Sequence, residues 1–205
     1  MRTLTHRFFA ASLAPLLTGG PLLRSAFRLG CVEPDLNFFT HIARSSPCVR
    51  SRAAFPAPLS EDSDPASASP ASDMAEKKWG CNGHDVPVIE RKITRLLGKL
   101  LSGKRRGTLF FFRLGVLIHY LTDAFTFAHN TSFDGTLADH VEYENRFHLY
   151  FVNRLPETAF TPRDGAPFDF RALHDDYLSA PSAFSTDYGF ILDASLSALS
   201  ALRAI

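Results

Sequence analysis

The stretch TLFFFRLGVLIHYLTDAFTFAH, residues 108–129, decides the fold of this chain. It is apolar on nearly every side, which is typical of a helix buried in the centre of a bundle. His119, Asp123 and His129 nevertheless lie inside it. Because a buried charge without a partner is very costly, these polar side chains require partners in the interior.

The polar pattern continues beyond this segment, as His119-x3-Asp123-x5-His129-x10-His140-x3-Glu144. Positions i and i+4 share a helix face, so each His-x3-acid pair can direct an imidazole and a carboxylate at one point. One such pair alone can be an ordinary hydrogen bond, whereas two pairs with a histidine between them favour a metal site in a bundle interior. Histidine and carboxylate ligands without clustered thiolates favour zinc, ahead of iron or manganese.

Elsewhere the chain also predicts helices. Apolar residues at helical spacing occupy 84–101 and 138–155, and two further helices are expected after residue 169. Pro34 interrupts any helix through the apolar stretch around it, so Asp35 is expected at a turn that begins a new helix. No strand alternation is convincing, and the predicted fold class is all-α.

Length and composition predict one domain over residues 1–205. The stretch at about 44–78 is rich in Ser, Pro, Ala and Asp, and we predict that it is a disordered insertion within the domain. A net charge of +1 gives no basic excess that would indicate a stable nucleic-acid partner. No apolar run reaches the roughly 18–20 residues of a transmembrane segment. The three cysteines are too few and too scattered for a disulfide framework.

The first 18 residues allow two interpretations. Arg2 and Arg7 before FFAASLAPLL resemble the charged and apolar regions of a signal peptide, but the small-residue cleavage pattern is poor and Gly-Gly-Pro follows. The other interpretation is an amphipathic first helix of the mature fold, which retains His6. We favour the second, which predicts a cytoplasmic rather than a secreted protein, and a signal peptide remains the alternative.

The stretch LGVLIHYLTDAFTFAHN followed by DHVEYE resembles the zinc-dependent phospholipase C family, whose members are all-α bacterial enzymes related to zinc-dependent nucleases. That family carries His-x3-Asp-x5-His and then, after a variable loop, His-x3-Glu. The nuclease branch typically ends in His-x3-Asp, so Glu144 favours the phospholipase branch. Upstream, FRLGCVEPDLNFFTH and GHDVPVIERKITRLL resemble the segments that supply a ligand aspartate and a ligand histidine, here Asp35 and His84.

The resemblance implies a multinuclear zinc site. One zinc would be held by Asp35, His84, His119 and Asp123, and a second by His129, His140 and Glu144. A third would share Asp123 and add His6. In secreted members this third ion also takes the amino group of an N-terminal tryptophan, whereas this chain begins with Met1 and has its single tryptophan at Trp79. Two zinc ions are therefore expected, with the third site open.

The function that the resemblance implies is hydrolysis of a phosphodiester by zinc-activated water, most specifically phospholipase C-type cleavage of a phospholipid. Asp35, Asp123 and Glu144 are the candidate catalytic carboxylates. The expected partners are a phospholipid or another phosphodiester, with transient contact to a membrane surface. A nuclease or nucleotidase is the alternative enzyme, and a metal-stabilised helical binding protein without catalysis is the alternative of another class.

Overall fold

The computed structural model describes residues 1–36, 86–103, 105–161 and 168–204. Every regular element within these ranges is helical, which confirms the predicted all-α class. The helices are α1 (Thr3–Leu13), α2 (Pro21–Gly30), α3 (Glu33–Leu36), α4 (Val86–Ser102), α5 (Thr108–Ala124), α6 (Leu137–Arg154), α7 (Phe170–Ser179) and α8 (Phe184–Ala201), with the short 3-10 turns η1 (Ala14–Leu16), η2 (Phe127–His129) and η3 (Leu155–Glu157). His84 and the predicted insertion at about 44–78 lie outside the described residues.

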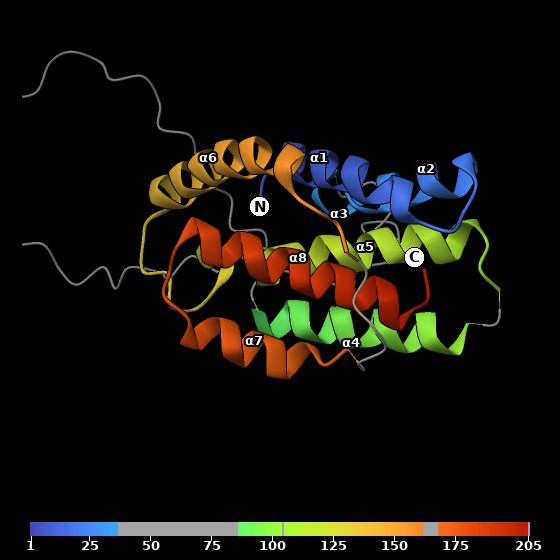
Figure 1. The fold of residues 1–205 in the computed structure, drawn as a ribbon. Helices are drawn as coiled ribbons and strands as arrows, with labels where there is room; N and C mark the ends of the chain where they lie inside the picture. Colours follow the sequence, from blue (N-terminus) through green and yellow to red (C-terminus); the bar gives the residue numbers. More distant parts are fainter. Residues whose placement is uncertain (37–85, 104, 162–167, 205) are drawn as a thin grey trace, which may run out of the picture.

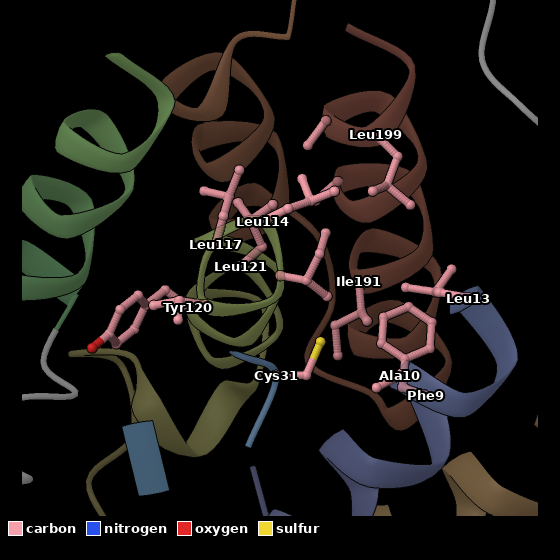
Figure 2. Close-up of a cluster of buried hydrophobic side chains, with 14 of the residues drawn as sticks. Phe9, Ala10, Leu13, Cys31, Leu114, Leu117, Tyr120, Leu121, Ile191 and Leu199 are labelled. Atoms are coloured by element: carbon pink, nitrogen blue, oxygen red, sulfur yellow. The ribbon is translucent and has the colours of Figure 1, made fainter. Parts of the chain in front are cut away.

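The central element is α5, as its sequence predicts. It packs against α1, α2, α4 and α8 (Figure 1), and every residue from 114 to 124 is buried. Figure 2 shows Leu114, Leu117 and Leu121 of α5 gathered with Ile191 and Leu199 of α8. This surrounding layer removes the middle of α5 from water, so its polar side chains lie inside the bundle.

Two glycines let α2 and α5 approach at backbone distance. A Cβ atom placed on Gly115 would lie 2.1 Å from the carbonyl oxygen of Phe27, and one placed on Gly30 would lie 2.1 Å from the carbonyl oxygen of Phe112. Only glycine is compatible with such an approach. The contact brings the C-terminal end of α2, and the short helix α3 that follows it, beside the middle of α5.

The apolar segment 108–129 is not one helix, and in this respect the sequence-based expectation was too long. The helix ends at Ala124, and His129 lies on the separate turn η2. The Nδ2 group of Asn130 donates to the carbonyl oxygens of Ala124 and Thr126, at 3.0 and 2.9 Å. These bonds satisfy carbonyls at the helix end, so the chain can turn without leaving them unpaired.

The other predicted helices lie where the spacing placed them. The segments 84–101 and 138–155 correspond to α4 and α6, and two helices follow residue 169. The expected break is present but lies earlier than Pro34: α2 ends at Gly30, a turn occupies residues 31–32, and Pro34 and Asp35 both lie in the new helix α3. Within the described part of the chain, no helix combines the length and the apolar character needed to cross a membrane.

Candidate metal centre

The structure brings the predicted ligands together in two groups. The first group is His6, Asp35 and His119, and the second is His129, His140 and Glu144. Within each group, one candidate ligand atom per residue lies within 4.8 Å of the others. Asp123 contacts two members of the first group.

In the first group, two imidazole rings face two carboxylates. Nε2 of His119 lies 3.1 Å from Oδ2 of Asp123 and 3.6 Å from Oδ1 of Asp35. Nε2 of His6 lies 3.2 Å from Oδ1 of Asp123. The rings of His6 and His119 stack, with their centroids 3.9 Å apart. Sequence spacing predicted the pairing of His119 with Asp123, but not the stacking of His6 on His119.

Hydrogen bonds on the far side of each ring fix the nitrogen that faces the carboxylates. Nδ1 of His119 lies 2.9 Å from the carbonyl oxygen of Cys31, which can only accept, so Nδ1 carries the hydrogen. Nδ1 of His6 lies 3.1 Å from the hydroxyl of Thr122, whose own hydrogen is donated to the His119 carbonyl. His6 Nδ1 must therefore donate as well. In the neutral rings, both Nε2 atoms present a lone pair, as metal ligands require.

The second group is built by α6 and η2. Thr136 and Asp139 form a capping box that fixes the first turn of α6, and His140 and Glu144 lie one turn apart on that helix. Oε1 of Glu144 lies 3.3 Å from Nε2 of His140 and 3.1 Å from Nε2 of His129. Helical spacing predicted the pairing of His140 with Glu144, and the family resemblance implied that His129 joins them.

An amino group lies between the two groups. The nitrogen of Met1 lies 2.9 Å from Oδ1 of Asp123 and 2.9 Å from Oε1 of Glu144, and it also contacts Nε2 of His129. Burial opposes its charge, but the two carboxylates outweigh burial and raise its pKa to about 10. The carboxylates of Asp123 and Glu144 therefore form a site that stabilises a positive charge.

The electrostatics of the centre favour ligand-ready protonation states at His6, Asp123 and Glu144, whereas at His119 burial is outweighed by Asp123 and Asp35, which raise the pKa of the ring. Burial and the neighbouring His119 lower the pKa of His6 to about 4, which keeps this ring neutral near pH 7. Burial disfavours the charged form of Asp123, yet the Met1 amino group and the neighbouring histidines lower its pKa well below the usual value. The pKa of Glu144 is lowered in the same way, because hydrogen bonds from His129 and His140 overcome burial.

The residues fit zinc. Ligand atoms held about 2.0–2.2 Å from a tetrahedral zinc lie roughly 3.3–3.6 Å from one another. Five of the imidazole–carboxylate distances in the two groups, 3.1 to 3.6 Å, lie close to that spacing, and the sixth, from Nε2 of His6 to Oδ2 of Asp35, is 4.0 Å. Asp35 adds an oxygen, Oδ2, that is buried and has no hydrogen-bond partner among the residues that the structure describes. A metal ion would satisfy this oxygen and would remove the repulsion between lone pairs that face each other.

The centre opens into a cleft of about 480 Å³. Three candidate ligands of the second group and Asp35 line this cleft together with the first residues of the chain; the lining is Met1, Arg2, Thr3, Leu4, Asp35, His129, His140 and Glu144. By contrast, His6, His119 and Asp123 lie behind it and are buried. A molecule entering the cleft therefore meets Asp35 and the second group first.

Sequence reasoning missed the side chains that support the ligands. Thr122 orients His6, the Cys31 carbonyl orients His119, and Asp187 on α8 accepts the backbone N–H of Phe127 at 2.8 Å. None of these carries a metal-binding spacing. Asp187 lies in the polar first turn of α8, so its place in the sequence gave no sign that it is buried. The aspartate that stands out in the sequence is Asp193, within the apolar segment GFILDASL, and it is only partly buried.

Comparison with known proteins agrees with this geometry. The sequence model of the zinc dependent phospholipase C family matches residues 5–193, a range that contains every candidate ligand named above. No curated protein and no solved structure gives a significant match to the chain. Because the family match spans most of the chain, the protein belongs to the zinc-dependent phospholipase C family and is a phosphodiesterase of that family.

Proposed function

We propose that this protein holds at least two zinc ions. His6, Asp35, His119 and Asp123 hold one end of the centre, and His129, His140 and Glu144 hold the other. The observation that carries the proposal is the convergence of imidazole Nε2 atoms on carboxylate oxygens at 3.1 to 4.0 Å in two adjoining groups. Asp123 is the proposed bridging residue, because its two oxygens face different neighbours.

When bound, zinc supplies a Lewis acid that lowers the pKa of water and polarises a phosphoryl oxygen. The chain supplies the ligands and a base. Asp35 is the best-placed base, because it is the carboxylate of the first end of the centre that lines the cleft. The other two carboxylates are engaged, since Asp123 contacts two imidazoles and Glu144 Oε1 contacts two imidazoles and an amino group. We therefore assign proton acceptance to Asp35, and charge stabilisation to Asp123 and Glu144.

A phospholipid is the proposed substrate, presented at a membrane surface. Exposed apolar side chains lie beside the ligands: Leu4 lines the cleft, Leu36 follows Asp35, and Val141 follows His140. Such side chains suit contact with acyl chains, whereas a site for nucleic acid requires a basic surface to bind the phosphate backbone. Arg2 also lines the cleft and is exposed, so it can attract the lipid phosphate.

The test is a panel of substrates, measured with and without chelator. Phospholipid vesicles, single-stranded DNA and a soluble chromogenic phosphodiester are incubated with the full chain. We expect release of diacylglycerol and a phosphorylated headgroup, abolished by chelation and restored by zinc. The matched variants are His140→Ala, which removes a ligand, and His148→Ala, which removes a histidine of the same helix that hydrogen-bonds to Thr5. Cleavage of DNA without cleavage of lipid would instead assign the nuclease function.

A further inference from the structure

The buried carboxylate of Asp187 lies outside both ligand groups. Asp187, in the first turn of α8, is 1% exposed and accepts three hydrogen bonds. The donors are the hydroxyl of Tyr143 at 2.7 Å, the hydroxyl of Tyr177 at 2.8 Å and the backbone N–H of Phe127 at 2.8 Å. They belong to α6, α7 and η2, so a single carboxylate on α8 joins three other elements.

The two oxygens of Asp187 have different neighbours. Oδ2 accepts from Phe127 and Tyr143, whereas Oδ1 accepts from Tyr177. Phe127 is the first residue of η2, the turn that carries His129, and Tyr143 directly precedes Glu144 on α6. One oxygen atom therefore connects both segments that supply the second ligand group.

These bonds restrain two degrees of freedom. The bond from Phe127 fixes the position of η2, which is not part of a continuous helix, and the bond from Tyr143 restrains the rotation of α6 about its axis. Hydrogen bonds to a charged acceptor are shorter and stronger than those between neutral groups. The three donors favour the charged form of Asp187, but burial outweighs them and raises its pKa above the ordinary value.

We propose that Asp187 is a positioning residue that sets the geometry of His129 relative to His140 and Glu144. The inference rests on the proposed function of that group as a zinc site. It assigns to α8, which supplies none of the candidate ligands, the role of holding the two ligand-bearing segments in register through one carboxylate oxygen.

The test compares three isosteric variants of the full chain, Asp187→Asn, Tyr143→Phe and Tyr177→Phe. Zinc affinity is measured by competition with a chromophoric chelator, the visible absorption of the cobalt(II)-substituted protein reports ligand geometry, and urea unfolding reports stability. We expect Asp187→Asn and Tyr143→Phe to weaken zinc binding at the second group on the order of tenfold and to change the cobalt spectrum. Tyr177→Phe removes the hydroxyl that donates to Oδ1, whereas the bonds from η2 and α6 reach Oδ2, and it should alter affinity by less than about twofold.

Three results would overturn the proposal, and they are distinguishable. If Asp187→Asn and Tyr143→Phe lose stability but keep the wild-type zinc affinity and cobalt spectrum, Asp187 is only a structural residue. If His140→Ala leaves the zinc content of the otherwise wild-type chain unchanged, the second group is not a zinc site, and the proposed function fails with the inference. Equal weakening by both tyrosine variants would also contradict the specific role of Oδ2.

Discussion

Nε2 of His119 lies 3.1 Å from Oδ2 of Asp123, one turn further along α5, while Nδ1 of the same ring donates to the carbonyl of Cys31. The first contact follows from helical spacing, and the second from the close approach of α2. Together they leave His119 with one orientation, in which its Nε2 faces the metal centre. The centre is thus set by helix packing as much as by its own ligands.

Replacing Asp123 by asparagine tests the proposed bridge. Asp123→Asn keeps the shape of the side chain but removes the charge that faces two imidazoles and the Met1 amino group. We expect kcat/KM for a phosphodiester to fall on the order of 100-fold or more, with loss of bound zinc. Steady-state kinetics and elemental analysis measure the two effects. Asp176→Asn, at an exposed position on α7, is the matched control and should behave as wild type.

The close approach of α2 and α5 at Gly115 predicts that a larger residue there lowers the stability of the protein. In Gly115→Ala the new Cβ meets the Phe27 carbonyl at 2.1 Å, so the helices must separate. We expect a loss of about 1–3 kcal/mol in the free energy of unfolding, as for other overpacked cores. Gly98→Ala on α4 meets nothing within 4 Å and should stabilise the protein by up to about 1 kcal/mol. Urea unfolding compares the two, and equal effects would show that the backbones do not touch at Gly115.

The sequence predicted the fold class and the main helices because their signals are local. The apolar character of α5 and the i,i+4 pairs depend only on residues close in the chain. The end of α5 at Ala124 was not predicted, because it depends on Asn130 and on the distant Asp187. A contact between residues far apart in the chain, such as that of Asp187 with Phe127, leaves no periodic pattern in the sequence.

The same division holds within the site. His140 and Glu144 follow from helical spacing, whereas the stacking of His6 on His119 depends on how α1 packs across α5. The resemblance to a known family supplied His6 and Asp35 as candidates, which spacing alone could not connect with residues more than 80 positions away. The resemblance gave no information on the hydrogen bonds that decide which ring nitrogen of His6 and His119 faces the metal centre.

Two exposed apolar side chains near the cleft residues predict a difference between lipid and soluble substrates. Leu4 lines the cleft and is 42% exposed, and Val141, which follows the cleft residue His140 in the chain, is 49% exposed. In the double variant that combines Leu4→Ser and Val141→Ser, activity on phospholipid vesicles should fall about fivefold or more, because apolar contact with acyl chains is lost. Activity on a soluble diester should stay within about twofold.

The control for this prediction is Leu178→Ser on α7, which removes a leucine of similar exposure away from the cleft. It should leave both activities unchanged. Equal losses on vesicles and on the soluble diester would show that Leu4 and Val141 support the site itself rather than contact with lipid.

A histidine outside the ligand groups predicts a dependence of stability on pH. His174 is buried against Asn130, and burial lowers its pKa in the folded protein below the ordinary value of about 6.5. The unfolded chain therefore takes up a proton at about pH 6.5 that the folded chain does not, so stability falls as pH drops below this value. Urea unfolding of chelator-treated protein at pH 7.5 and pH 5.5 measures the change. We expect a smaller change in His174→Gln, and an identical change would refute the assignment.

The most direct test of the central claim is the zinc content of the purified chain by elemental analysis, compared with His119→Ala and His140→Ala. These variants remove one imidazole from each ligand group. The wild-type protein should contain at least about two zinc ions per chain, and each variant should lose about one. A wild-type protein without zinc, or a zinc content that neither variant changes, would contradict the account.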